Sequence, residues 1–216
     1  MKRYIRAAIR DIGDEDVDVQ CELAWSDRTR GPELDKLLKS DDDWVRGAAL
    51  GNPNVSVQTL IDVSRSPDPQ DRINVARNPS TPSDVLNRLS YDYASGVRIN
   101  VAANPNTPVE ALERLLGDAD YMVREKVGAN PNISRDMMDL IVDQTITDAV
   151  SGLAANPNAP ADILAILAKN PWGGIRTRVA QNKNTDIETL QKLAQDDDYA
   201  PSYEAKKQLA ERGIEL

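Results

Sequence analysis

The chain of 216 residues is 40% hydrophobic and 28% charged, and its formal net charge is −9. This acidic balance disfavours broad binding to nucleic acid, which needs basic surface to neutralise phosphates. The absence of histidine and the single cysteine exclude serine–histidine and cysteine–histidine catalysis, an internal disulfide and a multi-cysteine metal site. No apolar run approaches the roughly 18–20 residues of a membrane span. The N-terminus lacks the apolar core of a secretion signal, so we expect a cytoplasmic protein.

Residues 1–18 are predicted to form an N-terminal helical cap. Five of them are spaced for one apolar helix face: Tyr4, Ile5, Ala8, Ile9 and Ile12. Gly13 can end this helix, and residues 14–16 are an acidic connector. An end cap of this kind is what a repeat array needs at its terminus, where the last repeat has no neighbour.

A repeated Asn-Pro-Asn motif follows. It is complete at 52–54, 104–106, 130–132 and 156–158, and weaker copies stand at 78–80 and 182–184. The first Asn of each copy falls at 52, 78, 104, 130, 156 and 182, which is a spacing of 26 residues without slippage. A fixed period in this range indicates a solenoid, in which one small supersecondary unit is repeated along an axis.

Apolar columns extend the repeats on both sides of the motif. Eight residues after the first Asn stand Leu60, Leu86, Leu112, Met138, Leu164 and Leu190, and three residues before it stand Ala49, Val75, Val101, Val127, Leu153 and Val179. Counting back once more places Leu23 and Leu34 in these columns, so residues 19–200 are predicted to hold seven repeats. Residues 201–216 are predicted to be a C-terminal capping helix whose apolar positions arrive four residues late. Together with the N-terminal cap these repeats would make a single elongated domain.

Each repeat reads as two short helical segments. Val97 and Val101 share one face of the first segment, and the residue before Pro105 ends it, because proline disfavours the α conformation in the residue that precedes it. A small residue follows the Val101 column in most repeats and would let neighbouring backbones approach. Thr107 is then predicted to cap the second segment, with Pro108 in its first turn.

Other repeat architectures do not fit this pattern. Ankyrin, tetratricopeptide and HEAT units are about 33 to 47 residues long, which exceeds this period. Ordinary leucine-rich repeats have a suitable length but need a strand where this chain has its Asn-Pro turn, and proline is disfavoured inside a sheet. The fold is therefore predicted to be all-α.

The repeat resembles the leucine-rich repeat variant family of bacterial proteins. The similarity rests on the pattern Val-Arg-x-x-Val-Ala-x-Asn-Pro-Asn-Thr-Pro, which begins at Val97 and recurs over roughly residues 19–200. It implies a right-handed solenoid of alternating α and 3₁₀ helices, with the shorter segment as the 3₁₀ one. Some members carry a cysteine-rich iron–sulfur segment, and this chain has only Cys21. The resemblance implies no common reaction or ligand, so no cofactor or metal is expected.

Two polar columns run through the repeats. Arginines stand six residues before the first Asn, at Arg46, Arg72, Arg98, Arg124 and Arg176. They are predicted to pair with Asp42, Asp68 and Asp120, each four residues before an arginine, and the alternative is an anion-binding stripe. The first Asn of each repeat is predicted to satisfy backbone groups between helices, because an amide both donates and accepts hydrogen bonds.

Aromatic residues gather in the connections that lead into the next repeat, where aspartates are also frequent. The candidate partner-binding residues are Trp44, Tyr93, Tyr121, Trp172, Asp43 and Asp120. Tryptophan and tyrosine are enriched at interface hot spots. The alternative is that these rings fill gaps between repeats.

These patterns favour a non-enzymatic interaction scaffold, bacterial or from a phage, that binds a macromolecule, most readily a basic protein. Two alternatives stay open. One is an acidic inhibitor that occupies a basic partner's surface, and the other is a nucleic-acid binder that uses the arginine column. Cys21 stands in a column without other reactive residues, and nothing nearby in sequence would activate its thiolate.

Overall fold

The computed structural model describes residues 17–144 and 147–214. Residues 1–16, which hold almost all of the predicted N-terminal cap, lie outside the described part. The chain divides into two compact units, residues 1–106 and 107–216, and each is described by itself. The single elongated domain therefore stays a prediction.

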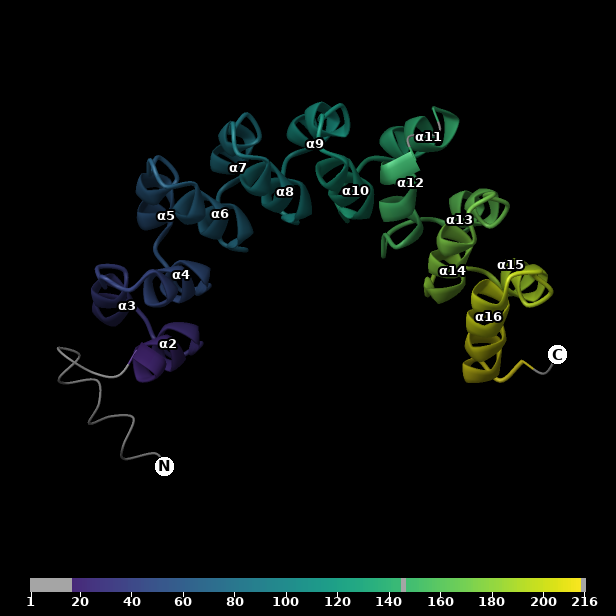
Figure 1. The fold of residues 1–216 in the computed structure, drawn as a ribbon, viewed down its shortest axis with the longest axis horizontal. Helices are drawn as coiled ribbons and strands as arrows, with labels where there is room; N and C mark the ends of the chain where they lie inside the picture. The colour runs from purple at the N-terminus through teal and green to yellow at the C-terminus, as the bar shows by residue number, and fades with distance from the viewer. Residues whose placement is uncertain (1–16, 145–146, 215–216) are drawn as a thin grey trace. The chain divides into compact units, whose positions relative to one another are not determined.

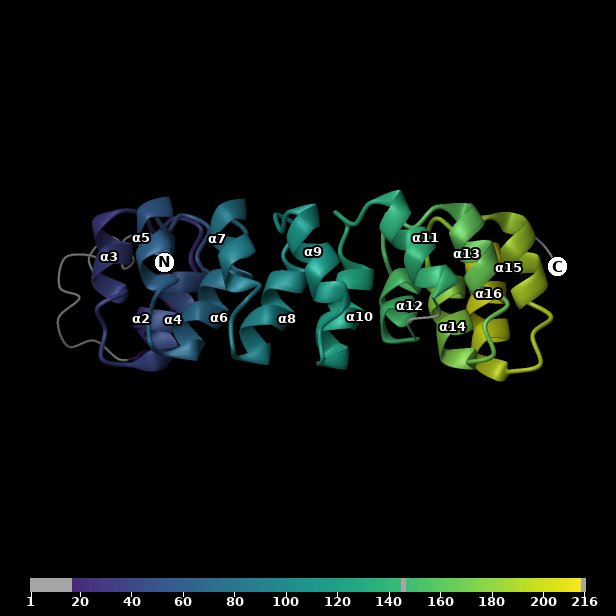
Figure 2. The same cartoon turned by 90° about the horizontal axis from the view of Figure 1, so that it is seen from above.

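Unit 1 consists of two rows of short helices (Figures 1 and 2). The first row is α2 (Val17–Trp25), α4 (Asp43–Gly51), α6 (Pro69–Arg77) and α8 (Ser95–Ala103), and the second row is α3 (Pro32–Leu37), α5 (Val57–Val63) and α7 (Ser83–Leu89). First-row helices begin at residues 17, 43, 69 and 95, so the period of the sequence is also the period of the structure.

Unit 2 has the same two rows (Figures 1 and 2). Its first row is α10 (Tyr121–Ala129), α12 (Thr147–Ala154), α14 (Gly173–Gln181) and α16 (Tyr199–Glu211), and its second row is α9 (Val109–Leu116), α11 (Arg135–Asp143), α13 (Ala161–Leu167) and α15 (Ile187–Leu193). The described residues contain helices and no strand, which confirms the predicted all-α fold.

The C-terminal helix is in register with the repeats and does not arrive four residues late. Helix α16 begins at Tyr199, 26 residues after Gly173 begins α14. Buried Pro201 and Ala205 occupy the columns of Ile175 and Val179. Counting leucines hid this register, because a proline and an alanine replace the usual branched residues.

The second segments are α-helices, and the 3₁₀ geometry implied by the resemblance is not found in the described residues. Leu60, Leu86 and Leu164 each donate their backbone N–H to the carbonyl four residues earlier, at 3.0–3.1 Å, which is the α-helical bond. Three-residue bonds occur where helices end, as from the Asn52 N–H to the Ala49 carbonyl at 3.1 Å. The 3₁₀ character is therefore confined to helix termini, where it is common.

The apolar columns form the core of each unit. Val75, Leu86, Val101, Leu112 and Leu164 are fully buried. Removal of such side chains from water is the main favourable contribution to folding. The column assignments made from the sequence are thus the positions that pack.

Helix ends follow the Asn-Pro motif, but one predicted cap is wrong. Asn52 and Asn104 terminate α4 and α8 with extended backbone, at ψ 130° and 127°, as expected for a residue before proline. The second segments begin after a proline, so Pro82 is the N-cap of α7 and Pro108 that of α9. In place of capping, the Thr81 hydroxyl donates to the Val75 carbonyl at 2.6 Å and so ties the turn to the preceding helix.

The first Asn of each repeat joins neighbouring repeats within a unit. Its side-chain Nδ2 donates at 2.6–3.0 Å to two carbonyls that lie 28 and 26 residues earlier, and this is seen at Asn52, Asn78, Asn104, Asn156 and Asn182. Its Oδ1 accepts the backbone N–H two residues later, as between Asn104 and Asn106 at 2.9 Å. The predicted structural role is therefore present, and it extends to the carbonyls of the preceding repeat.

Asn104→Ala should lower the free energy of unfolding of the intact chain by about 1–3 kcal/mol. The buried amide bonds to the Ala76 and Asn78 carbonyls, and its loss would leave these acceptors and the Asn106 N–H without their partner. The measurement is guanidinium unfolding followed by circular dichroism. Asn100→Ala is the control, because that amide bonds only within its own helix, to Gly96. Equal stability of the two variants would contradict the role assigned to Asn104.

Candidate aromatic binding edge

The four candidate aromatic residues lie where first-row helices begin. In unit 1, Tyr93 precedes α8 by two residues and Trp44 is the second residue of α4. In unit 2, Tyr121 is the first residue of α10 and Trp172 is the N-cap of α14. Their exposed fractions are 81% for Trp44, 77% for Tyr93, 58% for Tyr121 and 66% for Trp172. These rings present most of their surface to solvent, which argues against a gap-filling role.

Local sequence explains why rings at these positions stay exposed. The connection before each first-row helix is held by backbone and capping bonds, and its apolar contacts come from the helix residues that follow. Asp42 accepts the Trp44 and Val45 N–H groups at 2.8 and 3.2 Å, and Asp120 accepts the Met122 N–H at 2.9 Å. A side chain in this first turn is therefore directed by capping geometry and is left at the rim of the unit.

The two candidate aspartates differ in their surroundings. Asp43 is 79% exposed and forms an ion pair with Arg46. Asp120 is half-buried and serves as the N-cap of α10. Of the two, Asp43 has the carboxylate that a partner could reach directly, beside Trp44.

The arginine column is held by internal hydrogen bonds. Nη1 donates at 2.6–2.8 Å to the carbonyl six residues earlier in all five cases: Arg46, Arg72, Arg98, Arg124 and Arg176. This bond fastens the connection to the helix that follows it. The geometry favours the structural interpretation over a stripe that is free to bind anions.

The carboxylates that pair with these arginines differ from those predicted. Asp42, Asp68 and Asp120 cap the helix N-termini. Arg72 instead pairs with Asp92, 20 residues later, and Arg176 pairs with Asp196 and Asp198. Spacing along one helix suggested the wrong partners, because the real ones belong to the next connection.

Arg72 and Asp92 form the most enclosed of these pairs. Their side chains are each 7% exposed, and Nε and Nη2 donate to the carboxylate at 2.6 and 2.9 Å. Burial would raise the pKa of Asp92, but the hydrogen bonds from Arg72 and from the Ala94 N–H outweigh it and hold this pKa below its usual value. The same bond raises the pKa of Arg72. The guanidinium also lies 5.0 Å from the centroid of the Tyr93 ring, so an internal cation orients this exposed aromatic.

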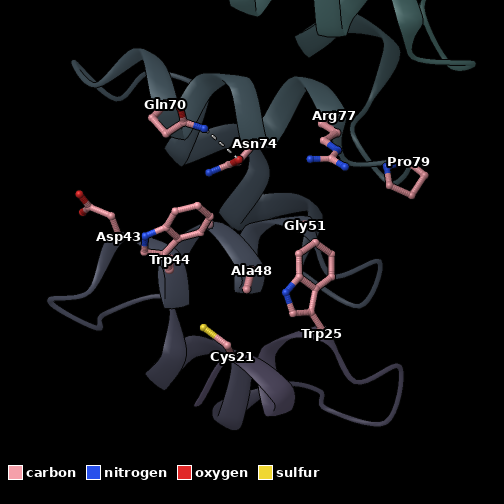
Figure 3. A pocket seen from close by; sticks show the side chains of 11 residues that line it. Cys21, Trp25, Asp43, Trp44, Ala48, Gly51, Gln70, Asn74, Arg77 and Pro79 are labelled. Carbon is pink, nitrogen blue, oxygen red and sulfur yellow. Dashed lines mark hydrogen bonds between the residues drawn. The ribbon is translucent and has the colours of Figure 1, made fainter. Parts of the chain in front are cut away.

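A groove of about 550 Å³ opens beside Trp44 in unit 1 (Figure 3). Trp25 of α2, which is 62% exposed, and Trp44 of α4 line it, and Gly47 and Gly51 are among its other lining residues. The sequence interpretation left Trp25 out, because this ring stands outside the connections. The available signal was the pair of glycines, since the Gly47 column holds Ile73 and Ile99 in the following repeats.

Among the described residues, no group of three or more acidic, histidine or cysteine side chains could hold a metal ion. Within the same residues, no helix has both the length and the apolar character needed to cross a membrane.

Comparison with known proteins bears out the predicted repeat family. Residues 96–120 match the family model described as leucine rich repeat variant. No curated protein matches the chain. A solved structure described as a leucine-rich repeat variant with a novel repetitive structural motif is 21% identical, covers 82% of this chain and 80% of its own, and has a TM-score of 0.37. An engineered protein is 17% identical, covers 84% and 96%, and has a TM-score of 0.34.

Proposed function

We propose that this leucine-rich-variant repeat scaffold binds another protein through the aromatic side chains at the N-terminal ends of its first-row helices. The observation that supports this is the exposure of Trp44, Tyr93, Tyr121 and Trp172, all between 58% and 81%. Exposed tryptophan and tyrosine rings at repeated positions are expensive to keep in water and are typical anchors of protein interfaces. The role is binding and not catalysis.

The charge of the chain indicates which partner would fit. With a formal net charge of −9 and an exposed carboxylate at Asp43 beside Trp44, the aromatic edge of unit 1 would attract a basic protein electrostatically. Opposite charges raise the rate of encounter, whereas buried rings provide most of the affinity. We therefore propose a basic protein as the partner, in the cytoplasm of a bacterium.

The two alternative functions make different predictions about salt. A nucleic-acid binder would need free arginines, and the arginine column is engaged by carbonyls and carboxylates. An acidic inhibitor that works mainly by charge would lose affinity steeply as salt is added, because screening weakens exposed charge pairs. A partner anchored by aromatic burial would lose association rate but keep most of its affinity.

Alanine at Trp44, Tyr93, Tyr121 or Trp172 should weaken capture of the partner by roughly tenfold or more, which is the usual effect at an aromatic hot spot. Each variant should keep its melting temperature, because exposed substitutions change stability by only about 0.5 kcal/mol. The measurement is quantitative capture from the native cell with intact wild-type and variant chains, followed by titration of the captured protein.

Tyr91→Ala is the matched control, because this ring is 69% exposed and lies outside the proposed edge. It should leave capture unchanged. Equal loss with Tyr91→Ala, or lost stability with unchanged affinity in the other variants, would contradict the proposal.

A further inference from the structure

We propose that the groove between Trp25 and Trp44 in unit 1 binds an arginine side chain of the basic partner, with the guanidinium stacked against the tryptophan rings. The inference rests on the proposed function, because the partner supplies the side chain. It adds a specific site and a specific chemistry. The groove volume of about 550 Å³ is within the roughly 300–1,000 Å³ of typical ligand pockets.

Missing side chains create the groove. Gly47 and Gly51 lie one turn apart on α4, with Ala48 beside them (Figure 3). A Cβ on Gly51 would meet the Trp25 ring at 3.6 Å, and a Cβ on Gly47 would meet the Asn74 amide at 3.1 Å. The next repeat has Ile73 and Arg77 in these two columns. The space is therefore particular to this position in the array and does not recur with the repeat.

The electrostatic field on the groove favours a cation. Cys21 lines it, and burial raises the pKa of this thiol, as do the negative charges of Asp42 and Asp18. Those same charges would stabilise a positive group placed beside the thiol. Asp43 adds a carboxylate at the Trp44 end of the groove, although Arg46 pairs with it.

A guanidinium suits these walls better than an ammonium does. It is planar and weakly hydrated, and it stacks on tryptophan, whose ring face is the best aromatic partner for a cation. The amide of Gln70 also lines the groove, and its carbonyl oxygen can accept an N–H of the guanidinium. Gly47, Ala48 and Gly51 leave room for the methylene stem of the side chain.

Arg77 is the one charged group of the groove that opposes this ligand. It is exposed and lies near Pro79 (Figure 3), and no hydrogen bond or ion pair to it is found among the described residues. Its charge would direct a bound cation toward the Trp44 end. The proposal therefore requires that Arg77→Ala strengthens the binding of a cation, by about two- to threefold for one partly screened charge at the surface.

The test uses N-acetyl-arginine amide as the probe and the indole N–H signals of the three tryptophans in ¹H–¹⁵N spectra of the intact chain. The probe should shift the signals of Trp25 and Trp44 with one dissociation constant on the order of 1 mM, as expected for a ligand of this size. Trp172, also exposed but outside this groove, should not respond in this range. N-acetyl-citrulline amide has the same shape without the charge and should bind about tenfold more weakly.

Two variants separate the groove from the folding of α4. Gly47→Ile places the residue of the next repeat in the groove and should abolish binding while both rings remain. Gly51→Ala makes only an ordinary contact with Trp25 and should leave binding unchanged, and circular dichroism checks that both variants are folded.

Equal affinity for the arginine and citrulline probes, or an equal response of Trp172, would overturn the proposal. So would binding of N-acetyl-glutamate amide that is lost in Arg77→Ala, since the groove would then be an anion site. A failed titration leaves partner capture through Tyr93 and Tyr121 standing, and failed capture leaves a positive titration intact, so the two proposals fail independently.

Discussion

Gly152→Ala should lower the free energy of unfolding by about 2 kcal/mol, although alanine is the better helix former by about 1 kcal/mol. The reason is the close approach of α10 and α12. A Cβ at Gly152 would stand 2.0 Å from the Glu125 carbonyl oxygen, and one at Gly128 would stand 2.0 Å from the Ala149 carbonyl oxygen. Both obstacles are backbone atoms, so the two helices would have to move apart. The measurement is guanidinium unfolding of the intact variant.

Gly174→Ala is the matched control. Gly174 also lies in a first-row helix, α14, and an added Cβ would meet nothing within 4 Å. It should leave stability unchanged or raise it by about 0.4–1 kcal/mol, because alanine restricts the unfolded chain. If Gly152→Ala proved as stable as Gly174→Ala, the close packing of α10 against α12 would be wrong.

The repeat register could be read from the sequence because packing and turn geometry both depend on residue type. A proline after Asn52 or Asn104 removes the α conformation from the residue before it, so the helix end was fixed by local chemistry. The leucine columns were equally readable, since only a buried position holds a large apolar residue in repeat after repeat. The start of α16 was misjudged, because Pro201 and Ala205 are weak apolar signals.

Contacts between repeats were less readable than the repeats themselves. The pairing of Arg72 with Asp92 joins residues 20 apart, and local spacing offered the nearer Asp68, which caps α6. Two acids competed for one arginine, and the helix N-terminus took the closer one because its N–H groups have no partner inside the helix. The partner could be assigned only when the position of the next connection was known.

The candidate site was found in part. Sequence placed Trp44, Tyr93, Tyr121 and Trp172 in the connections, but whether a ring there is buried depends on how far the neighbouring helix extends. The groove beside Trp44 was missed because it depends on two absent side chains, at Gly47 and Gly51. A pattern of apolar residues reveals a core, whereas a cavity is revealed by what a column lacks compared with its neighbours.

Leu112→Ala should lower the free energy of unfolding by about 2–5 kcal/mol, the range for a leucine removed from a closed core. Leu112 is fully buried in α9, and the same column holds Leu164 and Leu190, which are fully buried too. The loss combines the transfer free energy of the removed methyl groups with the cavity they leave. Guanidinium unfolding gives the size of the loss, and hydrogen exchange shows which helices lose protection.

Leu140→Ala provides the comparison, because this leucine of α11 is 40% exposed and gives up less burial when it is shortened. It should cost under about 1 kcal/mol. In a repeat array each repeat is stabilised by its neighbours, so the loss of protection in Leu112→Ala should be greatest in α9 and in α10, which follows it. Loss spread evenly over unit 2, or a cost equal to that of Leu140→Ala, would mean that the leucine column does not hold the repeats together.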